Sequence, residues 1–459
     1  MDPRTRLLLE GPPGRTILRL AWPNMLVMGA QSSIGLIETW YVSRLGTDAL
    51  AGMALVFPAF MLLQMVSAGA VGGGILSTLS RVLGADRREH ANGVVWAAVG
   101  VTLLLSGATT AAALAFGRDL YVLLGGTGGA LDAAVAYSTV VFAGAVPLWL
   151  FNSFSAVIRA QGNMAFPATV IVAGTALLVP VSPLLIFGWG PVPALGIAGG
   201  GLAVVAYYVI GTVILGWHIW SGRGVLKPTA RPPRLPLAAT GEILRIGLAS
   251  SISSVSTNVT VALAMAAAAA ASPAAVAGYG TAVRLEYLLI PLVFGLGAPT
   301  AAIVGTSIGA GDRARAVRVT WIAAGIAFAI TEAIGLAAAL FPARFLGLFT
   351  DDPAIVAAGA AYLAVVGPAY GFFGAGLALY FAAQATGRLA IPLAASLFRV
   401  GLVAALGGPA AHAFGPAGLY AVLAGAMVVY AGITASAVAS AVGVRRIGAW
   451  LAMRRVPSA

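Results

Sequence analysis

Cysteine is absent from this chain, and histidine occurs only at three scattered positions, His90, His218 and His412. Without thiols the protein can form no disulfide, no thiolate nucleophile and no cysteine-ligated metal site, and three scattered histidines do not make a zinc motif. A phosphate-binding loop is missing as well, because Gly72–Gly74 is preceded by no predicted strand and followed by no Lys-Ser/Thr pair. These absences argue against a metalloenzyme, a thiol enzyme and ATP-driven transport.

Charged side chains are also scarce, at 9% of the 459 residues, whereas 60% are apolar and the mean hydropathy is +0.96. A soluble protein of this size carries many more charges on its surface. The surplus apolar surface must therefore face lipid. The 59 glycines and 25 prolines agree with this, because both residues are commoner in membrane-spanning helices than in soluble ones. The sequence predicts an all-α membrane protein.

Stretches without charge mark the helices that can cross a bilayer, which takes about 20 residues each. Glycine and proline break three of these runs, at 188–196, 272–278 and 408–418. The first and third breaks each divide a run into two spans, and the second ends the span that begins at residue 246. The N-terminus continues into the first span without a cleavage site, so we interpret that span as retained. Twelve spans are predicted, within residues 20–37, 49–80, 90–117, 133–158, 160–222, 246–283, 287–311, 319–340, 353–387 and 400–443.

Basic residues gather on one side of these spans. The side with both termini holds 21 of the 26 Lys and Arg residues, and the opposite side holds only Arg44, Arg118 and Arg344. By the positive-inside rule both termini are cytoplasmic, as expected for a multi-pass protein of a bacterial plasma (inner) membrane. The net charge of +12 is then a topology signal, since nucleic-acid binding needs basic residues on one polar face.

The two halves of the chain resemble each other at an offset of 226 residues. Ile17–Leu20 matches Ile243–Ile246, and Gly52 matches Gly278. Because six spans per half is an even number, the halves have the same orientation and form parallel repeats, related by a pseudo-two-fold axis along the membrane normal. Two like bundles that rock about a central site are typical of a transporter.

The repeat also sets the expected domain organisation. We expect a six-helix lobe over residues 1–220, a basic, proline-rich cytoplasmic linker over 221–241, and a second six-helix lobe with a cytoplasmic tail over 242–459.

Several short motifs stand in order along the chain. The first half has Leu20–Pro23, Gly35–Thr39 and Arg44–Ala51, and the second half has Gly309–Arg315. In these motifs the sequence resembles the multidrug and toxic compound extrusion (MATE) family over nearly its whole length. The resemblance implies two six-helix lobes that export cationic or amphipathic compounds, driven by an inward flow of H⁺ or Na⁺.

The resemblance also places family positions on residues of this chain. Family members have a carboxylate in the first helix at the position of Glu38, usually as aspartate. Tyr137 and Asn152 align with polar family positions in the fourth span. Leu178 and Ser182 stand where a subgroup has an Asn and an Asp, and the acids that other members carry in the seventh and tenth helices have no counterpart. The resemblance therefore implies that the coupling ion binds either at Glu38 and its polar neighbours or at acidic residues other than those of the family.

Glu38 lies at membrane depth, where an ionisable side chain costs several kcal/mol unless it is paired, solvated or neutralised. It shares a helix face with Gln31 and Gly35, and Pro23 in the same span removes a backbone hydrogen bond, so this helix can bend. A lone carboxylate favours its neutral form there, which suits a group that takes up a proton on one side and releases it on the other. The alternative is that Glu38 merely contacts external water.

Four further charges, Arg284, Glu286, Glu332 and Arg399, also fall inside spans. Arg284 and Glu286 are two residues apart and therefore point to different faces of one helix. Arg399 needs a partner, which either Glu286 or Glu332 could supply. Two interpretations stay open: Glu286 and Glu332 couple ions, or they only form fixed pairs with Arg399.

The polar run Ser250–Thr260 has more polar side chains than helix packing requires, and Asn258 is the costliest of them to bury. We expect it to line a central cavity, with aromatic and methionine residues as an adaptable apolar wall. The alternative for each aromatic or methionine residue is that it only packs between helices. The candidate cavity residues are Gln31, Thr39, Tyr137, Asn152, Ser182, Ser253, Thr257, Asn258, Arg284, Arg399, Phe57, Met61, Tyr370 and Phe373.

These observations predict a monomeric, cation-coupled antiporter that exports small molecules by alternating access. H⁺ is favoured over Na⁺ as the coupling ion, because a Na⁺ site requires several convergent oxygen ligands and the second acid of the family has no counterpart here. The expected partners are small-molecule substrates and the lipid bilayer, with no nucleic acid, no metal and no cofactor besides the ion. The main alternative is a flippase of lipid-linked precursors in the same superfamily, in which Arg284 and Arg399 would hold a pyrophosphate. An import carrier also fits, whereas a membrane-embedded enzyme lacks a catalytic constellation.

Overall fold

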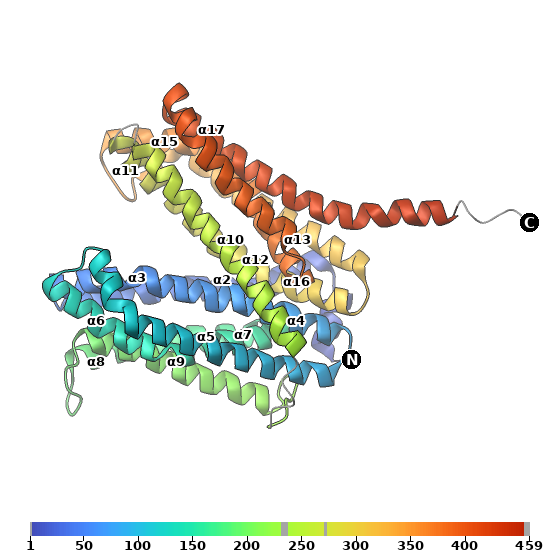
Figure 1. The fold of residues 1–459 in the computed structure, drawn as a ribbon, viewed down its shortest axis with the longest axis horizontal. Helices are drawn as coiled ribbons and strands as arrows, with labels where there is room; N and C mark the ends of the chain where they lie inside the picture. The colour runs from blue at the N-terminus through green and yellow to red at the C-terminus, as the bar shows by residue number, and fades with distance from the viewer. Residues whose placement is uncertain (1, 231–236, 270–272, 454–459) are drawn as a thin grey trace, which may run out of the picture. The chain divides into compact units, whose positions relative to one another are not determined.

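The computed structural model describes residues 2–230, 237–269 and 273–453, and nearly all regular structure in these ranges is helical (Figure 1). Within them, a single β-bridge joins Trp189 and Val192. A bilayer offers the backbone no hydrogen-bond partner, and a helix satisfies every interior N–H and C=O by itself. The all-α class predicted from the sequence is confirmed.

The chain divides into two compact units. Unit 1 comprises Met1–Glu10 and Arg19–Leu248, and unit 2 comprises Gly11–Leu18 and Ala249–Ala459. Two helices contribute to both units. The first turns of α2 (Pro13–Ser43) belong to unit 2, and the first turns of α10 (Leu237–Ala269) belong to unit 1. These two helices occupy equivalent places in the sequence repeat, so the exchange is reciprocal.

The other helices of unit 1 are α1 (Pro3–Glu10), α3 (Thr47–Gln64), the π-helix η1 (Met65–Val71), α4 (Gly72–Gly84), α5 (Arg88–Leu123), α6 (Gly128–Ala143), α7 (Ala145–Ala160), α8 (Ala165–Phe187) and α9 (Ile197–Trp220). Those of unit 2 are α11 (Pro273–Ala282), α12 (Arg284–Gly309), α13 (Arg313–Leu340), α14 (Pro342–Leu346), α15 (Pro353–Val366), the 3-10 helix η2 (Gly367–Ala369), α16 (Tyr370–Thr386) and α17 (Ala390–Met453).

Nine helical stretches of the described residues are long and apolar enough to cross a membrane, and α6 with α7 forms a tenth span with a 49° bend. The 31-residue helix α2 contains the span predicted at 20–37, and we count it as a further crossing helix. α17 supplies two spans, because Gly415 (φ 66°, ψ −163°) leaves the helical region of backbone space. Together these make the twelve spans that the sequence predicts.

The predicted breaks between spans can be followed in the same way. The break at 188–196 lies between α8 and α9, and the break at 408–418 contains Gly415. The break at 272–278 falls partly on residue 272, which lies outside the described residues.

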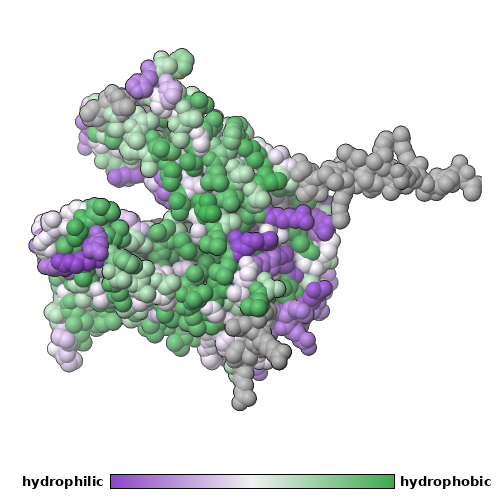
Figure 2. Space-filling view, in the orientation of Figure 1, coloured by the Kyte–Doolittle hydropathy of each residue, from purple (hydrophilic) through white to green (hydrophobic). Residues whose placement is uncertain are grey.

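Apolar side chains cover much of the molecular surface. Figure 2 shows hydrophobic residues along the sides of the helices, and hydrophilic residues gathered toward helix ends. Leu104, Phe116, Val213 and Leu248 are each about two-thirds exposed. A soluble protein rarely exposes apolar patches of this extent, so this surface is the one that contacts lipid.

The segment after α9 is held against unit 1 by side chains. The Gln161 side-chain oxygen accepts hydrogen bonds from the backbone N–H groups of Val225 (2.8 Å) and Leu226 (3.2 Å). Asn92 exchanges two hydrogen bonds with Thr229, at 3.0 and 3.1 Å. The first part of the predicted linker is therefore docked on unit 1, and few residues separate it from the start of α10.

Helix crossings in both units depend on the repeated glycines Gly52 and Gly278. A Cβ on Gly52 of α3 would lie 2.7 Å from the backbone nitrogen of Ala134 in α6. A Cβ on Gly278 of α11 would lie 2.7 Å from the backbone nitrogen of Gly359 in α15. Small residues let membrane helices approach this closely, which explains why both halves keep glycine here.

We expect Gly52→Val and Gly278→Val each to lower the unfolding temperature in detergent by about 5 °C or more, since overpacking against backbone costs about 1–3 kcal/mol. Thermal unfolding followed by intrinsic fluorescence measures this. Gly325→Val is the matched control, because a Cβ there meets nothing within 4 Å. An equal shift in the control would mean that valine, not the crossing, causes the loss.

Candidate functional site

Glu38 is buried in unit 1, near the C-terminal end of α2, with 4% of its surface exposed. The Tyr137 hydroxyl of α6 donates a hydrogen bond to Glu38 Oε2 at 3.3 Å. The other oxygen, Oε1, is buried and has no hydrogen-bond partner among the described residues. No cation lies within 4.0 Å of this carboxylate in the described part of the chain. Glu38 is therefore a buried acid with one neutral donor.

A chain of neutral polar groups also lies in unit 1. The Gln64 amide donates a hydrogen bond to the Tyr208 hydroxyl of α9. Asn152 of α7 donates to the Gln64 side-chain oxygen at 3.2 Å and to the Ser67 hydroxyl at 2.8 Å. Tyr208 lies within electrostatic reach of Glu38. The network therefore joins α9, α3, η1 and α7 within unit 1.

The two partners of Asn152 lie at the junction of α3 with the π-helix η1. Gln64 is the last residue of α3 and Ser67 lies inside η1, where the i→i+5 pattern replaces the ordinary α-helical one. Single π-turns are rare and occur often at functional sites. The rings of Phe151, Tyr207 and Tyr208 pack edge to face or tilted beside this network, with centroids 4.8–5.6 Å apart. Polar groups and aromatic faces thus occur together.

Unit 2 has a different polar site. Glu286 of α12 and Arg399 of α17 are both buried, at 6% and 4% exposure, and they line one small pocket with Thr260, Tyr279 and Tyr362. The guanidinium of Arg399 donates to the Thr257 hydroxyl at 3.0 Å and lies over the Phe373 and Tyr430 rings, at 5.3 and 5.4 Å from their centroids. In the part of the chain that is described, no acidic oxygen lies within 4.0 Å of it. The two opposite charges share a pocket without direct contact.

Glu332 has another partner than the one considered from the sequence. Its Oε2 accepts a hydrogen bond from the backbone N–H of Gly371 at 2.8 Å. Gly371 is in the first turn of α16, where helix N–H groups lack intrahelical acceptors and a negative charge is favoured. Glu332 therefore caps the N-terminus of α16, and the alternative pairing with Arg399 is not what the structure shows.

Arg284 and Glu286 point to different faces, as predicted. Arg284 is the first residue of α12, is exposed, and lies over the Phe349 ring at 5.0 Å, whereas Glu286 is buried. The structure therefore does not bring Arg284 into the pocket of Arg399.

The polar run of α10 is used largely for packing within unit 2. Ser253 bonds to Ser396 at 2.8 Å, and Gln384 donates to Ser250 at 2.7 Å. Hydroxyls commonly join membrane helices in this way, and the lining of a cavity by this run stays a prediction. Thr257 contacts Arg399, and exposed Asn258 bonds to the backbone of its own helix.

The remaining candidates divide by exposure. Ser182 is fully buried, and its hydroxyl has no partner among the described residues. Tyr370 and Phe373 are buried in unit 2, where the Tyr370 hydroxyl lies 3.3 Å from that of Tyr362. The side chain of Gln31 lies outside the described residues. Exposed candidates, whose side chains face lipid or an aqueous cavity, are Thr39, Phe57 and Met61.

Sequence reasoning missed Gln64, Ser67 and Tyr208. Gln64 is the one amide in the uncharged run 49–80, and an amide inside a span is costly unless it is hydrogen bonded. That cost was an available signal. Tyr208 carried no such signal, because tyrosine at helical spacing is usually packing.

A twelve-span helical chain with two sequence repeats and a buried polar site in each unit is a membrane transporter of the two-lobe type. The family model MatE matches residues 23–184 and again 248–409. The chain therefore belongs to the MATE family, whose members are transporters and not enzymes. The resemblance identified from the motifs is confirmed.

Relatives and solved structures agree with this assignment. The chain is 26% identical to the FAD transporter of Shewanella oneidensis, over 80% of this chain and 81% of that protein. It is 27% identical to the probable multidrug resistance protein NorM of Deinococcus radiodurans, over 76% and 78% of the two chains. A crystal structure of MATE in the bent conformation superposes with a TM-score of 0.89, at 24% identity, over 98% and 99% of the two chains. The two-lobe, twelve-helix fold is thereby confirmed.

The capping role of Glu332 predicts that Glu332→Gln, which keeps an acceptor for Gly371, unfolds within about 2 °C of the parent. Glu332→Leu leaves a buried N–H unpaired, which costs about 1–3 kcal/mol, and is expected to unfold about 5 °C lower. Thermal unfolding in detergent checks both. If Gln and Leu destabilise equally, the carboxylate has a role other than capping.

Proposed function

We propose that this protein is a proton-coupled exporter of cationic or amphipathic small molecules, a monomer with both termini in the cytoplasm, and that Glu38 carries the proton. The observation that supports this most directly is a buried carboxylate with a single neutral hydrogen-bond donor. An ionised carboxylate in such a place is costly, so proton binding and cation binding compete for it.

The competition gives a transport cycle. On the outer side, a proton binds Glu38 and removes the negative charge that holds a cationic substrate, which then leaves. On the inner side the proton is released, the charge returns, and Tyr137 donates to the carboxylate. Pro23 lies inside α2, where it removes a backbone hydrogen bond and lets the helix bend with the state of Glu38.

The pocket of unit 2 is proposed to hold fixed charges instead. Glu286 and Arg399 have opposite charges in one small pocket, so each offsets the electrostatic cost of burying the other. Proton transfer to Glu286 would leave Arg399 without this counter-charge. Glu38 has no such cation, and we therefore assign the coupling to Glu38 alone.

In proteoliposomes, Glu38→Gln is expected to lower ethidium transport driven by a pH gradient at least about tenfold, because an amide exchanges no proton at this position. Glu38→Asp keeps the carboxylate and is expected to retain part of the activity. Transport is measured under separately imposed pH and Na⁺ gradients, and the proposal predicts a response to the pH gradient only.

Glu332→Gln is the matched control, because it changes an acid of the other unit that caps a helix. It should transport as the parent does. Unchanged transport in the Glu38→Gln protein would refute the assignment, and a Na⁺-driven parent would refute proton coupling.

A second candidate is an aromatic anion with a diphosphate, the class to which FAD belongs. Support comes from the relative that is named an FAD transporter and from buried Arg399, whose guanidinium lies over two aromatic rings. Guanidinium groups bind phosphates through paired hydrogen bonds, and aromatic rings stack on flavins.

For this candidate, FAD counterflow in proteoliposomes is expected to fall about tenfold in Arg399→Gln and less in Arg399→Lys, whereas ethidium transport is retained. Equal loss of both substrates would assign Arg399 to stability, and absence of FAD counterflow in the parent would exclude this class.

A further inference from the structure

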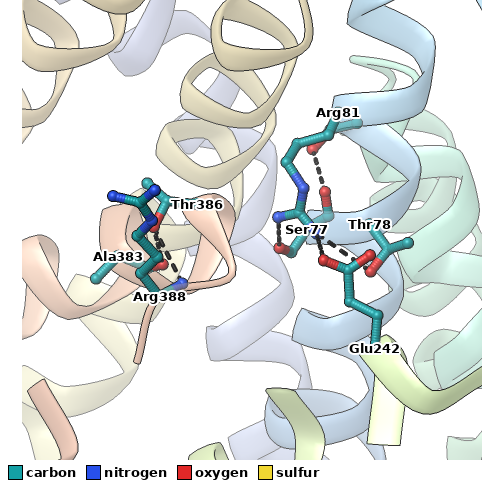
Figure 3. Close-up of polar contacts among 8 residues, drawn as sticks. Ser77, Thr78, Arg81, Glu242, Ala383, Thr386 and Arg388 are labelled. Atoms are coloured by element: carbon teal, nitrogen blue, oxygen red, sulfur yellow. Dashed lines mark hydrogen bonds and ion pairs between the residues drawn. The ribbon is translucent and has the colours of Figure 1, made fainter. Parts of the chain in front are cut away.

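Arg81 and Glu242 form a partly buried ion pair in unit 1, at the end of the spans that is rich in arginine. The guanidinium of Arg81, in the last turn of α4, lies 2.7 Å from the carboxylate of Glu242 in the first turns of α10. Their side chains are 15% and 34% exposed. Figure 3 shows Arg81 also reaching Ser77 and Thr78, its neighbours on α4. Hydroxyl groups of its own helix thus orient the guanidinium toward α10.

Glycines bring the two helices into direct backbone contact beside this pair. A Cβ on Gly74 would lie 2.8 Å from the backbone oxygen of Ile243, closer than real side chains approach. A Cβ on Gly247 would lie 3.3 Å from Cγ2 of Val71. We call this pairing of Val71–Arg81 with Glu242–Gly247 the α4–α10 contact. It is close and needs small residues on both helices.

The contact is placed where a transporter must move. α10 is one helix, yet Leu237–Leu248 belongs to unit 1 and the rest of it to unit 2. If the units move during alternating access, α10 must either leave α4 or bend at the boundary that follows Leu248. A partly buried ion pair near the end of the spans is weak enough to open and close, whereas breaking a helix exposes backbone groups to lipid.

The sequence repeat shows that only one half carries this charge pair. At the 226-residue offset, Ser307 stands for Arg81 and Thr16 stands for Glu242, and both are buried and uncharged. Salt screens the attraction between two charges, whereas two uncharged hydroxyls carry no charge to screen. The two equivalent places in the fold therefore differ in chemistry.

We infer that the α4–α10 contact, which the ion pair of Arg81 and Glu242 stabilises, separates when the transport path opens to the arginine-rich side of the membrane. The inference rests on the alternating access proposed above. It assigns Arg81 and Glu242 to the balance between conformations, with no role in holding the substrate or the proton.

The absence of cysteine allows a direct test, because Val71→Cys is then the single thiol of the protein. Val71 is 3% exposed, beside Gly247. In proteoliposomes a membrane-impermeant maleimide should label this thiol slowly. Adding Glu242→Gln should speed labelling about fivefold, as loss of a partly screened ion pair implies, and Glu242→Asp should lie between. Labelling needs no substrate and no ion gradient, so its outcome is separate from that of the proposed function.

Two further variants decide between a specific pair and general loosening. Arg81→Glu with Glu242→Arg restores the pair in reverse and should slow labelling again. Glu10→Gln removes an exposed ion pair of unit 1, Arg6 with Glu10 at 2.6 Å, and should leave labelling at the parent rate. Labelling of Glu242→Gln at the parent rate, or an equal increase in Glu10→Gln, would overturn the inference.

A crosslink tests whether the contact opens during transport. Cysteines at Val71 and Gly247 lie within reach of a disulfide. Oxidation should lower ethidium transport at least about tenfold, and dithiothreitol should restore it. A fully crosslinked protein that transports at the parent rate would show that the α4–α10 contact stays closed throughout the cycle.

Discussion

The cost of keeping one carboxylate out of water governs the arrangement of unit 1. Glu38 receives a single hydrogen bond from a tyrosine, and no cation of the described residues offsets its charge. Such a group is tolerated only if it spends part of its time neutral or has a cation beside it. The amides and hydroxyl of Gln64, Asn152 and Ser67, elsewhere in unit 1, are instead hydrogen bonded to one another, because each both donates and accepts hydrogen bonds.

The two halves share their helix crossings but differ in their buried polar residues. Gly52 and Gly278 make the same close crossing in both halves. By contrast, the equivalent of Glu38 in the second half is Ala264, which is fully buried. Glu286 stands at a position whose first-half equivalent is Phe60, and the equivalent of Arg399 is Gly174, because the offset is 225 residues where Gly162–Pro167 matches Gly387–Pro392. Each unit thus developed its own polar centre on a common helical frame, one with a lone acid and one with opposite charges.

Much of the fold could be predicted because it follows from few rules. Lipid demands long apolar helices, glycine and proline mark their ends, and a repeat fixes their number. The site was harder. Glu38 and Asn152 stood out as polar residues within spans, but the partner of Glu332 is a backbone amide that no side-chain pattern reveals. The hydroxyls of Ser250 and Ser253 form hydrogen bonds with Gln384 and Ser396. Composition cannot distinguish serines that join helices from serines that line a cavity.

The docking of the linker on unit 1 limits how far α10 can travel. Gln161 and Asn92 hold the chain as far as Thr229, and α10 begins at Leu237. An extended chain spans at most about 3.5 Å per residue, so this stretch reaches roughly 25 Å. The number of residues between Thr229 and Leu237 therefore sets an upper limit on the distance between Thr229 and the start of α10 in any conformation. Shortening this stretch by a few residues would restrict the opening, while lengthening it would not by itself drive the opening.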